Sequence, residues 1–254
     1  KAEWIGYGDD CTRLFFARAK QRKFVTYVYS LADGQGHTQN GFYNVACILH
    51  EYYSSLLGPS TQSTTPIDPS IIHLGKCLTP EQQHGLCVPL TDSDIRDAIF
   101  SIPNHKSPGP DGYSSGFFKA TCDQTGALVC ATVHEFFETG HLPPDVGHTK
   151  LVLIPKVSNP TRATDFHPIS CCNTIYKCIT KLLHSRLKMV LPHVVQEQQG
   201  AFMKGREILH NVLICQDIVR GYSRAGISPR CVIKLDIHKA FDSVQWSFIQ
   251  DLLV

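Results

Sequence analysis

The stretch VIKLDIHKAFDSV, residues 232–244, is the most informative part of the chain. Its first half is rich in β-branched and aliphatic residues, which predicts a strand over residues 231–237. This strand delivers Asp236 at its carboxyl end, where a carboxylate is well placed to hold Mg²⁺ while substrate phosphates complete the octahedral shell. Phe241 and Asp242 follow closely. The alternative is that Asp236 only stabilises the next turn, where aspartate is common, with Phe241 in the core.

Composition places the chain among ordinary folded proteins. It has 254 residues, 43% hydrophobic and 18% charged, with a formal net charge of +2, so a sizeable core can form. The mildly basic pI of about 8.0 does not by itself indicate a nucleic-acid partner. No apolar run reaches the roughly 18–20 residues needed to cross a bilayer, so no membrane partner is expected. The chain begins at Lys1 without a secretory signal pattern, and we expect it to be a fragment.

The sequence contains 11 cysteines, an odd number, and no CxxC pair. Such a set favours reduced cysteines that serve as small apolar core residues in an intracellular protein. Two weaker alternatives are zinc sites, neither with the usual ligand spacing. The first would use Cys171, Cys172, Cys178 and His184, and the second Cys77, His84 and Cys87.

Three segments are predicted along the chain. Residues 1–58 mix aromatic and cationic side chains and are expected to form an N-terminal extension. Residues 58–66, GPSTQSTTP, are polar, contain prolines and lack apolar periodicity, so residues 59–90 are predicted to be an irregular linker. Order is expected to return at Thr91, and residues 91–254 form the third segment.

Hydrophobic periodicity and turn residues predict a mixed α/β or α+β fold. Thr91 and Asp94 resemble a capping box at a helix start, and Gly140 is expected to end a later helix. The expected helices cover residues 10–20, 44–57, 91–101, 123–139, 172–191 and 206–222, and a last one starts near residue 246. The expected strands cover residues 24–31, 151–154 (buried) and 231–237. Four residues of the 206–222 helix are expected to face inward: Ile208, Val212, Leu213 and Val219.

An ordered set of motifs resembles one polymerase family. Residues 235–242 resemble motif A of reverse transcriptases, in which leucine–aspartate is followed by three residues and then Ala-Phe/Tyr-Asp. Upstream, residues 106–113 are similar to a K-x-P-G-P-D-G loop, 151–156 to L-I-P-K and 165–170 to F-R-P-I-S. Residues 4–16 resemble the stretch that precedes the polymerase in plant elements. Because the order is kept over most of the chain, it resembles reverse transcriptases of LINE-type (non-LTR) retrotransposons, those of plants in particular.

The resemblance implies a right-hand polymerase fold: the fingers, an incomplete palm, and a helical and stranded N-terminal extension. It implies RNA-directed DNA synthesis, with an RNA template, a DNA primer, a dNTP and Mg²⁺, for which Mn²⁺ is the alternative. Asp236 would be the catalytic residue and metal ligand, and the backbone carbonyl of Ile237 a second contact to the metal. Phe241 would be the ribose gate, the aromatic side chain that excludes a nucleotide 2′-hydroxyl. An intracellular location, in the nucleus, the cytoplasm or both, is expected.

Four further side chains are predicted to contact substrates. Lys156 could neutralise the triphosphate of the incoming nucleotide. Lys204 and Arg206 could contact template phosphates, although ordinary surface charge is the alternative for all three cations. His167 stands where the family has arginine, which offers a permanent charge and a bidentate fork. Because histidine is mostly neutral at pH 7, nucleotide binding is expected to be weakened.

Val254 is the last residue, and the family's paired aspartates would follow it. We therefore expect the chain by itself not to polymerise DNA, because two-metal chemistry needs more carboxylates. One alternative is a catalytically dead remnant that binds nucleic acid in a salt-dependent way. Another is a poorly folded, non-functional remnant with residues 231–237 as an exposed edge. A zinc-protease H-E-x-x-H motif fails at Glu138, and neither a P-loop nor a Gly-x-Ser-x-Gly elbow is present.

Overall fold

The computed structural model describes Lys20, residues 27–57, 68–72, 74–220 and 244–253, together with Tyr222, Gly226, Ile233 and Leu235. The chain divides into two compact units, residues 1–58 with 89–183, and residues 59–88 with 184–254. Each unit is described by itself. The predicted division into an extension, a linker and a third segment stays a prediction.

The first unit begins with a small hairpin and a helix. β1 (Ser30–Ala32) pairs antiparallel with β2 (Thr38–Asn40), and α3 (Phe42–Leu57) follows. The turn forms around Asp33, whose carboxylate accepts the backbone N–H groups of Gln35 and His37 at 3.0 and 2.9 Å, a common use of aspartate in turns. The predicted helix 44–57 is confirmed, whereas the described part of the predicted strand 24–31 belongs to a strand only from residue 30.

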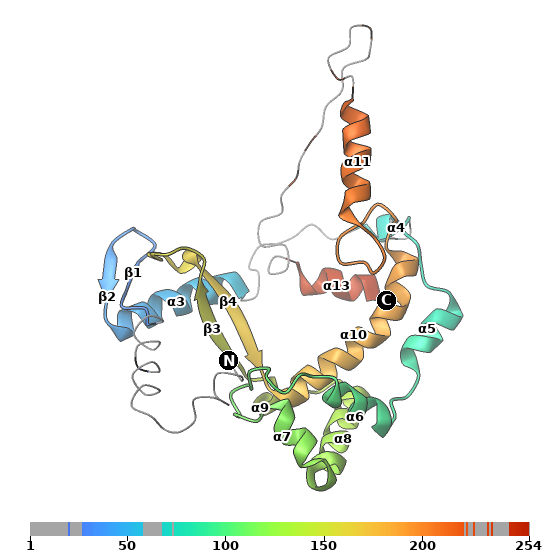
Figure 1. Ribbon diagram of the computed structural model, residues 1–254, viewed down its shortest axis with the longest axis horizontal. Helices are drawn as coiled ribbons and strands as arrows, with labels where there is room; N and C mark the ends of the chain where they lie inside the picture. Colours follow the sequence, from blue (N-terminus) through green and yellow to red (C-terminus); the bar gives the residue numbers. More distant parts are fainter. Residues whose placement is uncertain are drawn as a thin grey trace. The chain divides into compact units, whose positions relative to one another are not determined.

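A longer hairpin follows later in the same unit. β3 (Thr149–Pro155) pairs antiparallel with β4 (Phe166–Cys172), in register from Thr149↔Cys172 to Pro155↔Phe166, and the short helix η1 (Ala163–Asp165) leads into β4. Two strands alone are only marginally stable. One side of this hairpin packs against the first: Leu31, Val45 and Phe166 form a buried cluster with Leu153 at its edge, and α3 lies beside β3 and β4 (Figure 1).

The predicted strand at 151–154 exists, but the prediction that it is buried was wrong. Leu151, Val152 and Ile154 are 42%, 40% and 44% exposed. A hairpin of two strands has no third layer on its second face, so an apolar run in it need not lie in a core. β4 was not predicted as a strand, and Cys172, expected in a helix, is its last residue.

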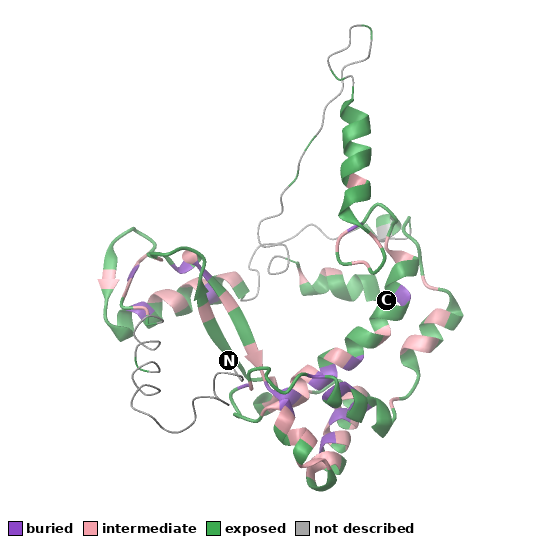
Figure 2. Cartoon of the chain, in the orientation of Figure 1, coloured by how far each residue is buried: buried purple, intermediate pink, exposed green. Residues whose placement is uncertain are grey.

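Helices form the larger core of the first unit. They are α6 (Asp92–Phe100), α7 (Ser115–Ala120), α8 (Cys122–Thr139), α9 (Pro144–Gly147) and the first part of α10 (Thr174–Val194). Their buried apolar residues form one cluster from α6, α8 and α10, namely Ile95, Ala98, Ile99, Val129, Val133, Cys178, Ile179 and Leu182. Figure 2 shows these buried residues in purple where the three helices meet. The predicted helices at 91–101, 123–139 and 172–191 are confirmed, with small shifts of their ends.

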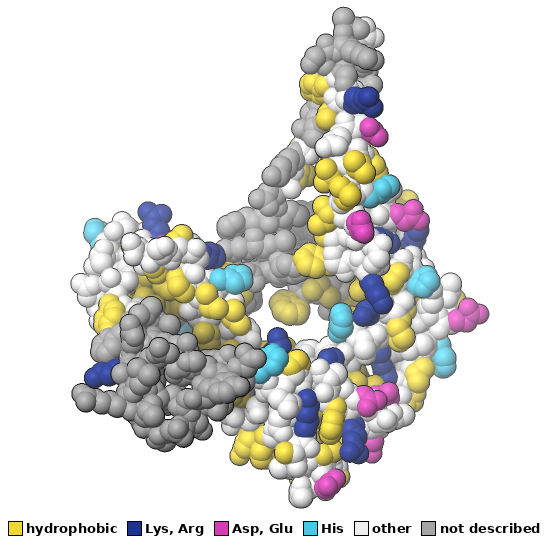
Figure 3. All heavy atoms as spheres, in the orientation of Figure 1, with side chains coloured by type: hydrophobic (Ala, Val, Ile, Leu, Met, Phe, Trp, Pro, Cys, Tyr) yellow, Lys and Arg dark blue, Asp and Glu magenta, His cyan; other side chains and the backbone are white. Residues whose placement is uncertain are grey.

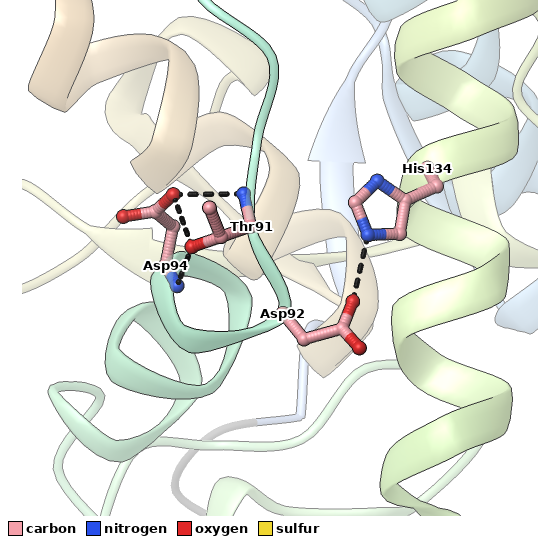
Figure 4. A network of polar contacts seen from close by, with 4 residues as sticks. All are labelled: Thr91, Asp92, Asp94 and His134. Atoms are coloured by element: carbon pink, nitrogen blue, oxygen red, sulfur yellow. Dashed lines mark hydrogen bonds and ion pairs between the residues drawn. The ribbon is translucent and has the colours of Figure 1, made fainter.

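Capping interactions fix where these helices begin and end. Thr91 and Asp94 form the predicted capping box: the Asp94 N–H donates to Thr91 Oγ1 at 3.2 Å and the Thr91 N–H to Asp94 Oδ2 at 2.9 Å (Figure 4). Beside it, Asp92 Oδ1 lies 2.8 Å from His134 Nε2, which joins the start of α6 to α8 (Figure 4). α8 ends at Gly140, whose φ of 69° is left-handed, as predicted.

The second unit contains shorter elements around the second part of α10. They are α4 (Pro69–Ile72), α5 (Pro80–Cys87), α11 (Ile208–Val219) and α13 (Trp246–Leu253). Arg186 of α10 donates to the carbonyl oxygens of Leu86, at 3.0 Å, and Val88, holding the end of α5. The predicted helix near residue 246 is confirmed. None of the helices among the described residues is long and apolar enough to span a membrane.

Two expectations about this unit were wrong. Residues 80–87 are not irregular but helical, because Thr79 and Gln82 form a capping box and Pro80 starts the helix. The predicted inward side chains of α11, including Ile208 and Val212, are exposed, and no residue of this fully described helix is buried. Hydrophobic side chains lie on the surface over α11 (Figure 3).

Candidate functional site

The outer face of the β3–β4 hairpin brings together two of the predicted nucleotide-binding residues. His167 pairs with Ile154 across the two strands, and Lys156 lies two positions beyond Ile154. Because side chains alternate between the faces of a strand, Lys156 and His167 share one face. Both are exposed, as is Lys150 further along the same face. Leu153 and Phe166 project to the opposite, packed face.

Lys156 is held in place at the tip of this hairpin. Its backbone N–H donates to the carbonyl oxygen of Asp165 at 2.8 Å, which continues the strand pairing by one residue. Its Nζ donates to the carbonyl oxygen of Thr164 at 3.0 Å. An ammonium has three donors, so two remain for a ligand. The structure therefore presents a positioned, exposed cation beside His167.

The loop that joins β3 to β4 is organised by one carboxylate. Asp165 Oδ2 accepts the backbone N–H groups of Thr161 and Arg162, both at 2.9 Å. These bonds stabilise the charged form, first through Thr161 and then Arg162, and hold the pKa of Asp165 below its ordinary value of 3.8. The backbone carbonyl oxygen of the same aspartate accepts the N–H of Lys156. Asp165 therefore contacts both the loop, through its carboxylate, and Lys156, through its backbone.

The N-terminal hairpin also supports this loop. The Ala32 N–H donates to the carbonyl oxygen of Thr161 at 2.7 Å, and Ala32 forms an isolated parallel bridge with Arg162. Beside this bond, Leu31 is 1% exposed and packs with Phe166, the residue before His167. Residues 30–45 are therefore part of the structure that holds the candidate site.

Asn173 connects three segments at the base of the hairpin. Its Nδ2 donates to the carbonyl oxygens of Asp145, at 2.8 Å, and Val146, at 3.4 Å, and its Oδ1 accepts the N–H of Asp111 at 3.3 Å. It is 3% exposed. A side chain on Gly109 would overlap with Asn173, so the loop at this point needs glycine.

The first turn of α10, directly after Asn173, holds the loop of residues 106–113. Thr174 Oγ1 donates to the carbonyl oxygen of Tyr113 at 2.9 Å, and Lys177 Nζ to that of Ser107 at 2.6 Å. The motif loop 106–113 is thus fixed to the strand–helix junction that follows β4. Sequence reasoning named this loop but missed Asn173, for which the only local signal was a polar residue between a strand and a helix.

The two predicted template-binding cations, Lys204 and Arg206, lie in the second unit and differ in their surroundings. Lys204 is exposed, whereas Arg206 is half-buried. The Arg206 guanidinium donates to the carbonyl oxygens of Gln196, at 2.5 Å, Gln199, at 3.0 Å, and Val195, at 3.2 Å. Template contact by either residue stays a prediction.

The predicted catalytic centre cannot be compared with the fold, because Asp236, Ile237 and Phe241 lie outside the described residues. Among the residues that are described, no group of three or more His, Cys, Asp or Glu side chains could hold a metal ion. Both zinc alternatives are therefore wrong, since all their ligands are described. The nine described cysteines are free thiols.

Comparison with known proteins defines the class. Residues 154–252 match the family described as reverse transcriptase (RNA-dependent DNA polymerase). The matched region begins on β3 and includes both Lys156 and His167, so the hairpin is part of a reverse transcriptase domain. Enzymes of this family generally use divalent metal ions, a nucleic-acid template and primer, and deoxynucleotides.

Individual relatives define the type of element. The chain is 31% identical over 172 residues to the transposon TX1 uncharacterized 149 kDa protein of Xenopus laevis, covering 68% of this chain and 13% of that protein. It is 27% identical over 164 residues to the retrovirus-related Pol polyprotein from type-2 retrotransposable element R2DM of Drosophila melanogaster, covering 65% and 15%. A similar polyprotein from type-1 retrotransposable element R2 of Bradysia coprophila is 27% identical over 165 residues, covering 65% and 18%.

The chain belongs to the reverse transcriptases of LINE-type (non-LTR) retrotransposons, as its motifs indicated. It spans only 13–18% of the length of these relatives. The predicted α/β polymerase fold class is confirmed by this match and by the mixed helices and strands. The closer resemblance to plant elements stays a prediction.

Proposed function

We propose that this chain contributes the fingers and the first palm motif to RNA-directed DNA synthesis, in which a primer 3′-hydroxyl attacks the α-phosphate of a deoxynucleotide. The observation that supports this most directly is the shared exposed face of Lys156 and His167 on the β3–β4 hairpin. Phosphoryl transfer depends largely on positioned cations around the phosphates. Lys156, whose backbone N–H and Nζ both make hydrogen bonds at the tip of the hairpin, is such a cation.

Lys156 and His167 would bind the triphosphate of the nucleotide with different strength. The Lys156 ammonium is a compact charge with free donors. His167 lacks the permanent charge and the bidentate fork of the arginine that the family resemblance leads one to expect at its position. We therefore expect Lys156 to contribute more than His167 to triphosphate binding by this hairpin.

Asp236 and the backbone carbonyl of Ile237 would hold Mg²⁺, or Mn²⁺ in its place, and Phe241 would exclude a ribose 2′-hydroxyl. The support for these roles is the motif order and the family match over residues 154–252. A bound divalent ion would supply Lewis-acid stabilisation of the phosphoryl oxygens. Two-metal phosphoryl transfer would need further carboxylates beside this aspartate.

The remaining partners follow from the same proposal. An RNA template and a DNA primer would be bound mainly through their phosphates, with Lys204 exposed in the second unit as a candidate contact. A location in the nucleus, the cytoplasm or both would suit this activity.

Titration of the full chain with a fluorescent deoxynucleoside triphosphate and Mg²⁺ tests the proposal. Lys156→Gln should weaken binding by about tenfold, the loss of one charge-assisted contact. Lys150→Gln is the matched control, because Lys150 lies on the same face of the hairpin six residues, or about 20 Å, away. His167→Arg should strengthen binding at pH 7.5, because arginine adds a permanent charge and a bidentate fork. If Lys150→Gln weakened binding as much as Lys156→Gln, or His167→Arg had no effect, the hairpin would not be the triphosphate site.

A further inference from the structure

Two side chains hold the segment between α10 and α11 through hydrogen bonds to its backbone carbonyl oxygens. Four carbonyl oxygens, those of Val195, Gln196, Gln198 and Gln199, accept hydrogen bonds from two side chains. Arg206 donates to three of them, as described above. Asn211 Nδ2 donates to the fourth, that of Gln198, at 2.9 Å. We call this arrangement the carbonyl clamp.

The backbone packs tightly around the carbonyl clamp. Gly200 is buried, and a side chain there would come within 3.0 Å of Asn211 Nδ2. Gly205 has a φ of 80°, a left-handed conformation that favours glycine. This turn separates two neighbouring cations: Lys204 before it is exposed and Arg206 after it is half-buried. Two cations that the sequence presents as equivalent therefore have different environments.

Arg206 uses most of its donors inside the clamp. A guanidinium carries five N–H groups; both hydrogens of Nη1 and one of Nη2 are used by the three carbonyl oxygens. These acceptors follow directly after the last residue of α10, Val194, where the helix dipole places partial negative charge. A cation at this position is stabilised without any phosphate.

We infer that Arg206 is a positioning residue: with Asn211, it fixes residues 195–200 so that their glutamine side chains face a nucleic-acid strand. Four carbonyl groups of the segment bond to the clamp side chains, whereas the side chains of Gln196, Gln198 and Gln199 are exposed. Of these, Gln199 also donates through Nε2 to the carbonyl oxygen of Ala201 at 3.2 Å. Amide side chains both donate and accept, which suits contacts to sugars and phosphates without sequence preference. That the ligand is a nucleic acid rests on the proposed function, whereas the carbonyl clamp is seen in the structure itself.

Two substitutions at Arg206 separate this role from a phosphate contact. Lysine keeps the charge and can bind phosphate as a point charge, but one ammonium cannot reproduce the fork that spans three carbonyl oxygens. Arg206→Lys and Arg206→Gln should therefore both speed amide hydrogen exchange in residues 195–211, by about tenfold. Lys204→Gln is the matched control, a cation two residues away outside the clamp, and should leave this exchange unchanged.

Binding of a short single-stranded RNA to the full chain gives the second measurement, made between about 50 and about 200 mM salt. Lys204→Gln should reduce the slope of log affinity against log salt by about 0.7, the value for one lost phosphate contact. Arg206→Gln should lower affinity severalfold at every salt concentration and leave the slope unchanged, and Arg206→Lys should not rescue it.

The opposite pattern would overturn the inference. It would consist of a reduced slope in Arg206→Gln, restored by Arg206→Lys, with normal amide exchange in both variants. If the wild-type chain bound no RNA at all, the proposed function would lose its template contact. The exchange measurement would still decide whether Arg206 and Asn211 hold residues 195–200.

Discussion

Asn173 and Asp145 are joined by a hydrogen bond of 2.8 Å from the Asn173 side chain to the Asp145 backbone carbonyl oxygen, although 28 positions separate them in the chain. This bond connects the segment before β3 to the residue after β4, so it closes the open end of the hairpin. The same side chain accepts the N–H of Asp111. The hairpin that carries Lys156 is thereby fixed to the loop 106–113 at its base.

Replacing this side chain should therefore loosen the hairpin. Asn173→Leu keeps the size of the side chain but leaves the carbonyl of Asp145 and the N–H of Asp111 without their partner. Buried polar groups without partners cost about 1–3 kcal/mol each. Because these two bonds are only partly buried, we expect the free energy of unfolding to fall by about 1–3 kcal/mol in total. Urea denaturation measures the loss. Asn44→Ala, an exposed asparagine with one local bond, should change the midpoint little, and an equal loss in both variants would contradict this role for Asn173.

The N-terminal hairpin should be needed for order at the tip of the second hairpin. Leu31 is 1% exposed and packs with Phe166 and Val45, so Leu31→Ala should cost about 2–5 kcal/mol through the cavity that it leaves. Faster amide exchange should appear in β3 and β4, although these strands lie more than a hundred residues away in the sequence. Phe42→Ala is the control, because Phe42 lies in the same region and is 76% exposed. Exchange that rose only within residues 27–57 would show that the two hairpins are independent.

Local signals predicted the elements whose determinants lie within a few residues. The capping box of Thr91 and Asp94 and the left-handed Gly140 were both read correctly, because each depends on short-range hydrogen bonds. The capping box at Thr79 carried the same signal and was missed, since the surrounding residues looked irregular. The family motifs predicted that Lys156 and His167 belong to one site, and the strand register places them on one face.

What the sequence could not show depends on partners far along the chain. One face of β3 is covered because Leu153 packs against the cluster that contains Leu31. No residue close to Leu153 in the sequence indicates this contact. Arg206 and Lys204 look alike in the sequence. The difference between them comes from backbone carbonyl acceptors, which every residue has and which no sequence pattern can therefore indicate. Burial of α11 was expected from its apolar pattern, but a pattern shows only that a face can be buried, not what covers it.

Acid should weaken the loop between β3 and β4. Because the folded pKa of Asp165 lies below its ordinary value of 3.8, its contribution to stability is full above that value and disappears as the pH falls through the lowered folded pKa. Asp165→Asn keeps an acceptor but removes the charge. The difference in urea midpoint between the wild type and Asp165→Asn should therefore be constant from pH 7 to about pH 5 and shrink toward pH 3. A difference that did not change between these limits would mean that the carboxylate charge has no part in holding Thr161 and Arg162.

Thiol chemistry should report directly on the helical core. Burial raises the pKa of Cys178 to about 12, and its Sγ lies 3.7 Å from the carbonyl oxygen of Ile95. The thiolate is the reactive form, so at pH 8 only about one Cys178 in ten thousand would be ionised, and iodoacetamide also has to reach it. Cys77 and Cys87 are exposed free thiols in the other unit. Peptide mass spectrometry after native labelling should find those two modified and Cys178 intact until urea separates α10 from α6. Labelling of Cys178 in the native protein at the rate of Cys77 would mean that α6 and α10 do not pack through this residue.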